Sequence, residues 1–257
     1  MNDDQPGASL SANIEFTVDG RVISLTVQVP AGPVSPRRIL PLVNRLTDVV
    51  VDMAVEAQDE KVSCSKGCGA CCRQLVPISV VEARAIDALV QAMDEPRRGA
   101  VVARFADACR RMEEAGLMDR LRDFSRLASV DEMMRFGLDY FHLGVACPFL
   151  EDESCSIHGD RPVICREFLV TSDARHCADP GPQIIRRIDL GARISRALPS
   201  LEARTDLPTM PWLPLILALE WAAANPENSE RSGTELLQAL FGCLSGKDLP
   251  APPGLGA

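Results

Sequence analysis

The sequence predicts a mainly α protein with a small β component, an α+β fold. Apolar residues at helical spacing recur along most of the 257 residues, whereas partial alternation of apolar residues marks a stretch near the start. Cysteines gather in two separate blocks. The chain is long enough to bury a core, so stability alone does not require cross-links between cysteines. We therefore expect an N-terminal β-hairpin, a cysteine-rich core and surrounding helices.

The first expected element is a β-hairpin over about residues 13–29. Two runs of partly alternating apolar residues flank Asp19-Gly20, a dipeptide favoured in two-residue hairpin turns. A helix is expected next, starting at Ser35-Pro36 or later at Pro41, because proline is favoured at the first helical position. The apolar residues with helical spacing are Ile39, Leu42, Val43, Leu46, Val50 and Met53.

Residues 79–142 are predicted to form a helical insert between the two cysteine blocks. Its first helix starts at a capping box of Ser79 and Glu82, in which each residue satisfies a free backbone amide of the other. Pro96 opens a second helical stretch. A further capping box starts at Ser129 and precedes the last helix of the insert.

The part of the chain after the second block is predicted to be helical. Helices are expected over residues 184–198, 212–224 and 234–244, and residues 249–257 are expected to form a frayed tail. The stretch Asn225-Pro226-Glu227-Asn228 separates the last two helices as a loop.

The charge and the amino-acid composition of the chain argue against some classes of partner and indicate a cellular compartment. The net charge of -9 argues against a general binder of nucleic acid or anionic membranes. The first residues lack the basic start and the apolar run of a secretory signal, and the most apolar stretch, residues 211–224, is too short to span a bilayer. We expect a soluble, cytoplasmic protein without membrane contact. In that reducing compartment, ten cysteines indicate metal or redox chemistry more readily than disulfides.

The first cysteine block is the stretch CSKGCGACCR, which holds Cys64, Cys68, Cys71 and Cys72. Because thiolates repel one another, so dense a cluster is hard to sustain without a cation or oxidation. A helical turn from Cys68 would bring Cys71 and Cys72 to its face, while Cys64 approaches from a loop. The side chains of the adjacent Cys71 and Cys72 would then diverge, so they need not bind the same ion. The glycines of the block suit tight turns whose amides point at a metal-bound sulfur.

Two alternatives to a chelating block arise from the residues themselves. The spacing of Cys64, Cys68 and Cys71 matches that of radical SAM enzymes, in which three thiolates hold an iron-sulfur cluster. Those enzymes need a barrel of alternating strands and helices, and here a helical stretch precedes the motif and no such series follows it. The other alternative is a set of inert buried cysteines.

The second block follows the insert and supplies Cys147, Cys155 and Cys165, and Cys177 comes after it. The segments PFL and CSI flank the polar turn EDES, so Cys147 and Cys155 are expected on facing strands of a short hairpin. Asp160 is expected to cap a helix with Pro162 in its first turn, which places Cys165 near the helix N-terminus. A thiolate is favoured there, because the free amides and the helix dipole offset its charge.

Arginines bracket Cys165 in the sequence, at Arg161 and Arg166. They either compensate an anionic thiolate site or pair structurally with acidic neighbours, and the sequence leaves both interpretations open. The acidic candidates are Glu151, Asp152, Glu153 and Glu167. We expect His158 and His176 to hydrogen-bond or face solvent, and Cys109 and Cys243 to be small core residues of amphipathic helices.

Taken together, the two blocks resemble the YkgJ-type cysteine-cluster family, also called CxxCxxCC proteins or the zinc- or iron-chelating domain. The resemblance covers roughly residues 61–180. It rests on vicinal Cys71-Cys72 after two spaced cysteines, and on the ordered block C-P-F-L, C-S-I-H, R-P and C-R. It implies a metal of unsettled identity. It also implies the ligands Cys64, Cys68, Cys71, Cys72, Cys147, Cys155 and Cys165, with Cys177 as a further candidate.

The chain departs from the family pattern in two respects. The first interval is x3, where the short name of the family has x2, and the insert is long, so the second block must fold back over the first. We expect three parts: residues 1–60 with the N-terminal hairpin and helix, 61–180 as the cysteine-cluster metal-binding domain, and 181–257 as a C-terminal helical extension.

The expected function is metal binding through two blocks of cysteines. Eight thiols suffice for two zinc sites of four thiolates each, or for one [4Fe-4S] cluster with spare cysteines. The density of the first block slightly favours iron-sulfur over zinc. Some relatives resemble flagellin lysine N-methylases, so an iron-sulfur enzyme such as a protein lysine N-methylase is the alternative. A thiol redox switch at Cys71-Cys72 is a third hypothesis. The sequence identifies neither catalytic residues nor a protein partner.

Overall fold

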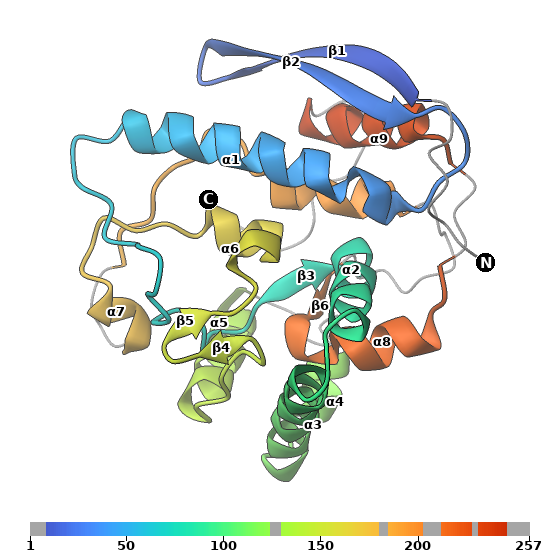
Figure 1. The fold of residues 1–257 in the computed structure, drawn as a ribbon. Coiled ribbons are helices and arrows are strands. Elements are labelled where there is room, and N and C mark those ends of the chain that lie inside the picture. The colour runs from blue at the N-terminus through green and yellow to red at the C-terminus, as the bar shows by residue number, and fades with distance from the viewer. Residues whose placement is uncertain (1–8, 124–129, 180–184, 203–211, 228–230, 246–257) are drawn as a thin grey trace.

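A computed structural model of the chain describes residues 9–123, 130–179, 185–202, 212–227 and 231–245. Helices dominate these residues, and their strands form three separate two-stranded antiparallel sheets (Figure 1). The predicted class, mainly α with a small β component, is confirmed. The strand-helix series that a radical SAM barrel requires does not occur in the described part of the chain.

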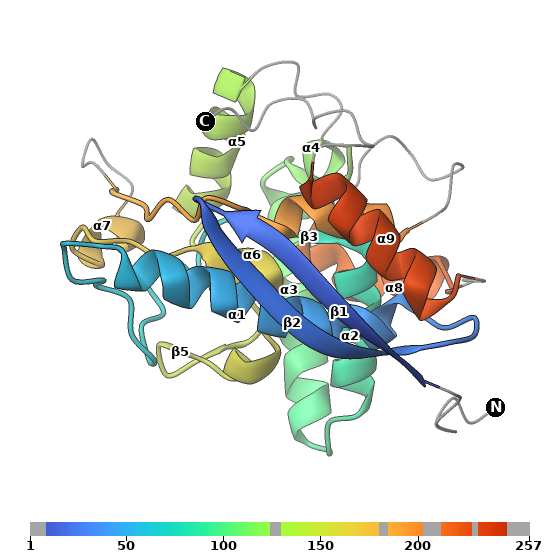
Figure 2. The same ribbon diagram turned by 90° about the horizontal axis from the view of Figure 1, so that it is seen from above.

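The N-terminal hairpin consists of β1 (Ser9–Val18) and β2 (Arg21–Pro30), and it is longer than predicted. Its turn residues, Asp19 (φ 48°) and Gly20 (φ 75°), both have positive φ, which a tight hairpin turn of this hand requires. The hairpin lies over α9 (Gly233–Leu244) at one end of the molecule (Figures 1 and 2). Phe16 and Phe241 pack against each other in this contact, with ring centroids 5.7 Å apart.

Both predicted starts of the next helix are used. The segment η1 (Pro36–Ile39) is a 3₁₀ helix whose first amides are capped by the Ser35 hydroxyl, which accepts from the Arg37 N–H at 3.2 Å. It runs into α1 (Leu40–Glu56), which has proline in its first turn. The buried side of α1 is formed by Leu40, Val43, Leu46, Thr47 and Val50.

The helical insert contains α2 (Val80–Gln91), α3 (Arg97–Glu114), α4 (Met118–Arg122) and α5 (Val130–His142). The capping box of Ser79 and Glu82 forms as predicted, with both reciprocal hydrogen bonds present. Ser129, the predicted start of the last capping box, lies outside the described residues. A short strand, β3 (Pro77–Ser79), precedes α2 and pairs with β6 (Trp212–Pro214) near the other end of the chain.

Two helix predictions for the last part of the chain are wrong in part. Within the expected helix 184–198, the described residues 185–193 are extended or irregular, and the 3₁₀ helix η4 (Ile194–Leu201) follows. Ile188 and Leu190 are buried while their neighbours are exposed, which is the period of a strand, and Gly191 has a φ of 63°.

The expected helix 212–224 is divided into β6, the 3₁₀ helix η5 (Leu215–Leu217) and α8 (Ala218–Ala224). The extended start follows from the pairing of β6 with β3, and Pro214 closes the strand. The helix predicted over 234–244 is α9, and the tail 249–257 lies outside the described residues.

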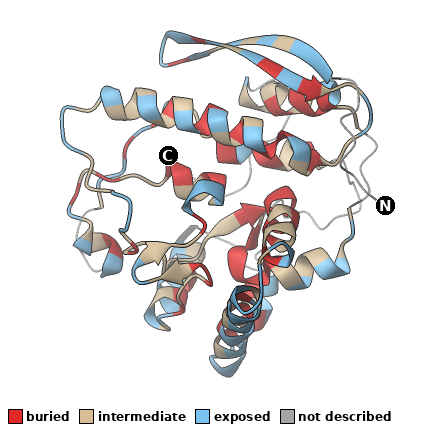
Figure 3. Ribbon diagram, in the orientation of Figure 1, coloured by how far each residue is buried: buried red, intermediate tan, exposed pale blue. Residues whose placement is uncertain are grey.

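The hydrophobic core extends from α1 across α2 and α3 to η4 and α8. Figure 3 shows its buried residues on the inward faces of these helices, with exposed residues on the outside. The described residues include no helix with the length and apolar character needed to cross a membrane. Core packing thus fixes the helices independently of the cysteines, and the two cysteine blocks lie at the edge of this core.

Candidate metal centre

The first cysteine block forms a series of tight turns, and the helical turn expected from Cys68 is not present. The Cys68 N–H donates to the Ser65 carbonyl at 3.0 Å, and the Cys72 N–H donates to the Gly69 carbonyl at 2.9 Å. Gly67 adopts a φ of 89°, which a continuous right-handed helix excludes. Cys71 and Cys72 affect each other's pKa, and the expectation that they need not bind the same ion stays a prediction.

The second block builds the small hairpin β4 (Leu150–Glu151) and β5 (Ser154–Cys155). Cys155 lies on β5 opposite Leu150, whereas Cys147 precedes β4 and does not face it as predicted. The Leu150 N–H donates to the Cys147 carbonyl at 2.9 Å, so Cys147 begins a turn rather than a strand. The polar stretch EDES makes a tighter connection than we expected, with Asp152 and Glu153 both at positive φ.

Hydrogen bonds join the two blocks and the residues next to them at several places. The Cys147 N–H donates to the Cys72 carbonyl at 2.7 Å, which fixes the start of the second block against the end of the first. The Ser63 N–H donates to the Val170 carbonyl at 2.9 Å, and the Gln74 amide donates to the Cys177 carbonyl at 3.3 Å. The second block therefore folds back over the first, as the sequence required.

Gly69 is the point of closest approach between the blocks. A Cβ at this position would lie 2.7 Å from the Glu153 carbonyl oxygen and 2.7 Å from Leu150 Cδ1. Both atoms belong to the β4–β5 hairpin, so only glycine lets the first block pack against it. Arg73 reinforces this contact, because its guanidinium pairs with the Glu153 carboxylate at 2.5 and 3.0 Å.

A Gly69→Ala substitution is expected to push the two blocks apart. Overpacking of this kind costs roughly 1–3 kcal/mol of folding free energy, and we expect a lower melting temperature together with weaker retention of metal. Thermal unfolding and metal analysis of the purified variant measure both. Gly159→Ala is the matched control, since a Cβ there meets nothing within 4 Å. Equal behaviour of the two variants would contradict the steric role of Gly69.

Cys165 lies on α6 (Val163–Glu167), a helix of one turn and a half that two buried carboxylates hold in place. The Glu82 carboxylate, which already caps α2, also accepts from the Val163 N–H at 2.8 Å. The Glu167 carboxylate accepts from the Ser195 N–H at 2.9 Å and so ties α6 to η4. The predicted cap of this helix by Asp160 is not formed, because the acceptor comes from α2 instead.

Arg166 on α6 is fully engaged in structural contacts. Its Nη1 pairs with both oxygens of Asp48 on α1 at 2.9 and 3.1 Å, Nη2 donates to the Gly159 carbonyl, and Nε donates to the Arg161 carbonyl at 3.2 Å. None of the four acidic neighbours proposed from the sequence is its partner. Asp48 could not be predicted as the partner, since local spacing contains no information about which helix packs on α6.

The pKa values of the candidate thiols reflect their crowding. Hydrogen bonding from Cys72 lowers the pKa of Cys71 to about 7, and donation of that hydrogen bond raises the pKa of Cys72. Burial raises the pKa of the other thiols and the charge of Cys71 raises each of them further, which applies to Cys64, Cys147, Cys155, Cys165 and Cys177. Cys71 thus lies close to the thiols of both blocks.

Cys68 affects two of the other candidate thiols. Its charge raises the pKa of Cys64 and Cys177, in addition to the larger effect of burial on both thiols. Each of the eight candidate thiols therefore interacts electrostatically with at least one other. Even so, no three His, Cys, Asp or Glu side chains of the described residues come near enough to one another to enclose a metal ion.

The chemistry of this donor set fits a thiophilic metal. Half-buried thiols dominate the contact between the blocks, and all ten cysteines of the chain are free thiols. Zinc and iron-sulfur clusters are both held by such sulfur ligands. Cys109 and Cys243 lie apart on α3 and α9, where the Cys109 thiol donates to the Ile216 carbonyl at 3.4 Å.

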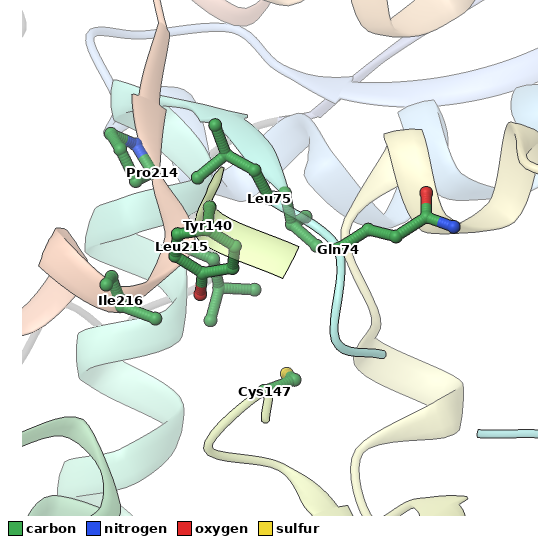
Figure 4. A pocket seen from close by; sticks show the side chains of 8 residues that line it. Gln74, Leu75, Tyr140, Cys147, Pro214, Leu215 and Ile216 are labelled. Atoms are coloured by element: carbon green, nitrogen blue, oxygen red, sulfur yellow. The ribbon is translucent and has the colours of Figure 1, made fainter. Parts of the chain in front are cut away.

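A small cavity adjoins Cys147 (Figure 4). Tyr140 of α5, Gln74 and the residues around Pro214 line it, and its volume is about 10 Å³. That is room for about one water molecule. Burial and the neighbouring Cys147 raise the pKa of Tyr140, so its hydroxyl stays protonated at neutral pH.

Sequence reasoning found the thiols and missed the groups that position them. Glu82 was assigned to its own helix only, and its second hydrogen bond to Val163 had no local signal. Gln74 and Asp48 were not singled out at all. A polar residue next to a cysteine block, as Gln74 is, was the only hint that the sequence offered.

Comparison with known proteins identifies a family model that matches the segment with the two blocks. Residues 63–180 match the family model CxxCxxCC, which is described as a "putative zinc- or iron-chelating domain". No curated protein and no solved structure matches the chain. The matched segment contains all eight candidate thiols, from Cys64 to Cys177. Over residues 63–180, somewhat less than half of the chain, the sequence thus matches the CxxCxxCC family.

Proposed function

We propose that this protein chelates zinc or iron with thiolates from both cysteine blocks, and that the metal holds the blocks together. The proposed ligands are drawn from Cys64, Cys68, Cys71, Cys72, Cys147, Cys155, Cys165 and Cys177. The observation that carries the proposal is the contact between the blocks next to Cys71, where the Cys147 N–H donates to the Cys72 carbonyl at 2.7 Å. A single cation beside Cys71 would relieve repulsion across the whole set.

Between the two metals, we favour an iron-sulfur cluster. Four cysteines in consecutive turns resemble the ligation of such clusters more than two paired zinc motifs do. The backbone amides of the turns at Gly67 and Gly69 suit hydrogen bonds to cluster sulfur. A bound cluster would supply electron transfer or substrate activation, whereas zinc would supply folding free energy.

An iron-sulfur enzyme, such as a protein lysine N-methylase, is the second candidate. Such an enzyme needs space for its substrate beside the metal. The cavity next to Cys147 has room for about one water molecule, which does not favour a substrate the size of a lysine side chain there. We therefore propose a site saturated by protein sulfur. We also infer a reducing compartment such as the cytoplasm, because the chain keeps all ten cysteines as free thiols.

Anaerobic purification followed by metal analysis and an absorption spectrum tests this proposal. Broad visible absorption together with iron and sulfide would support the iron-sulfur assignment. A colourless protein with stoichiometric zinc would support chelation and exclude the cluster. A protein that binds neither metal, even when its thiols are fully reduced and both metals are supplied, would overturn the proposed function.

A further inference from the structure

Arg161 stands between the cysteine cluster and α6, and its main chain is fixed. It follows the 3₁₀ helix η3 (His158–Asp160) in extended conformation and precedes Pro162, the residue at the start of α6. The Arg166 guanidinium donates to its carbonyl at 3.2 Å. The backbone of Arg161 is thus held by the same contacts that hold the helix of Cys165.

The side chain of Arg161 is half-buried and lacks an acidic partner. Its Nη1 contacts the His158 imidazole, and its Nε is buried without a hydrogen-bond acceptor. Among the described residues, no carboxylate lies within ion-pair distance of it, and Asp48, whose charge acts on it, is paired with Arg166. A buried N–H without an acceptor is costly, so this arrangement favours an anionic acceptor beside Arg161.

Apart from Asp48, the groups around Arg161 that can become anionic are thiols. Burial raises the pKa of Cys64 and Cys155, and the positive charge of Arg161 opposes this rise and also favours the thiolate of Cys71. Cys165 acts on the guanidinium in turn. Arg161 therefore lies near cysteines from both blocks, which is where the proposed metal would be bound.

We propose that Arg161 is the counter-cation of the metal centre and donates its free Nε–H to a metal-bound sulfur. This inference rests on the proposed function. It also assigns separate roles to the two arginines, which the sequence left open: Arg166 stabilises the fold, and Arg161 compensates the charge of the metal centre. A divalent ion with four thiolates has a formal charge of about -2, so a nearby guanidinium stabilises the bound form. Arg161 is a positioning residue and is not itself a ligand.

Replacing Arg161 is expected to have different effects on the metal-free and the metal-bound protein. Without metal, its unpaired charge lowers stability, so Arg161→Gln is expected to leave the melting temperature of the metal-free protein unchanged or to raise it. With metal, the same substitution removes a hydrogen bond and a compensating charge. We expect the affinity for Zn²⁺ to fall by at least about tenfold, the size of effect typical of groups that hydrogen-bond to metal ligands.

The test uses the full chain, reduced and stripped of metal under anaerobic conditions. Zn²⁺ affinity is measured by competition with a coloured chelator, Co²⁺ binding by thiolate absorption, and stability by thermal unfolding with and without metal. Arg161→Lys retains the charge and loses the Nε–H, so it should recover part of the affinity. Arg110→Gln is the control, since Arg110 lies on α3 and pairs with Asp107 and Glu114 away from the thiols.

Three results would overturn the inference while the proposed function stands. These are an unchanged affinity in Arg161→Gln, a Lys variant no better than the Gln variant, and a metal-free Gln variant that melts at a clearly lower temperature. The last would make Arg161 an ordinary structural residue. If the unaltered, reduced protein binds neither Zn²⁺ nor Co²⁺, nor iron supplied together with sulfide, the proposed function fails and the inference fails with it.

Discussion

A Cys71→Ser variant is expected to lose its metal. Cys71 is the thiol whose charge reaches both blocks, and hydrogen bonding from Cys72 lowers its pKa to about 7, so it is the candidate most readily ionised at neutral pH. Serine keeps the size of the side chain but is a poor ligand for a thiophilic metal. We expect apparent affinity to fall by at least about a hundredfold, measured by metal content after purification and by chelator competition.

Cys243→Ser is the matched control for this substitution. Cys243 is a partly exposed thiol on α9, under the hairpin and apart from both blocks, so its variant should retain the full metal content. Retention of metal by the Cys71 variant would show that the centre is built without its most central thiol. In that case, the ligand set proposed above would be wrong.

The second large effect is expected from Glu82→Ala. Glu82 is fully buried, and its carboxylate accepts from the N–H groups of Ser79 and Val163 at 2.8 Å and from the Ser79 hydroxyl at 2.9 Å. Alanine leaves these buried donors without an acceptor, each at a cost of about 1–3 kcal/mol. We expect roughly 3 kcal/mol or more of lost stability, measured by denaturant unfolding of the metal-free protein.

Glu235 offers an internal comparison because it forms the same capping box with Ser232 at the start of α9. That box is exposed to solvent and has no partner on a second helix, so Glu235→Ala should lower stability only slightly. Glu82→Ala should also weaken metal binding, because α6 and Cys165 lose their anchor on α2, whereas Glu235→Ala should not. Similar losses from the two variants would show that Glu82 acts on its own helix alone.

Local chemistry in the sequence was enough to predict several elements of the fold. The turn at Asp19-Gly20, the proline starts at Pro36 and Pro41 and the capping box at Ser79 all depend on neighbouring residues, and all are present. The extended residues before η4 were mistaken for a helix because Ile188 and Leu190 lie among apolar residues that satisfy both periods. Whether the helical or the strand period applies depends on the surface against which the segment packs. The spacing of apolar residues along one segment does not reveal that surface.

The local sequence was likewise insufficient to predict the structure of the candidate site. Cysteine spacing identified the thiols and the order of the two blocks, yet the helical turn at Cys68 and the strand position of Cys147 were wrong. Both depend on the contact between the blocks, where the Cys147 N–H meets the Cys72 carbonyl and Gly69 meets the hairpin. The caps and ion pairs of α6 come from α1 and α2, so no pattern near Cys165 could have predicted them.

The hydrogen bond between Cys147 and Cys72 also makes the whole helical insert a single closed loop. The entropy lost on closing a loop grows only slowly with its length, so a long insert costs little more to close than a short one. A metal that binds thiols at both ends of this loop would act as a reversible cross-link between them. The stability gained on binding would then come partly from restricting the unfolded chain, and removing the metal should loosen the second block before it loosens the helices of the core.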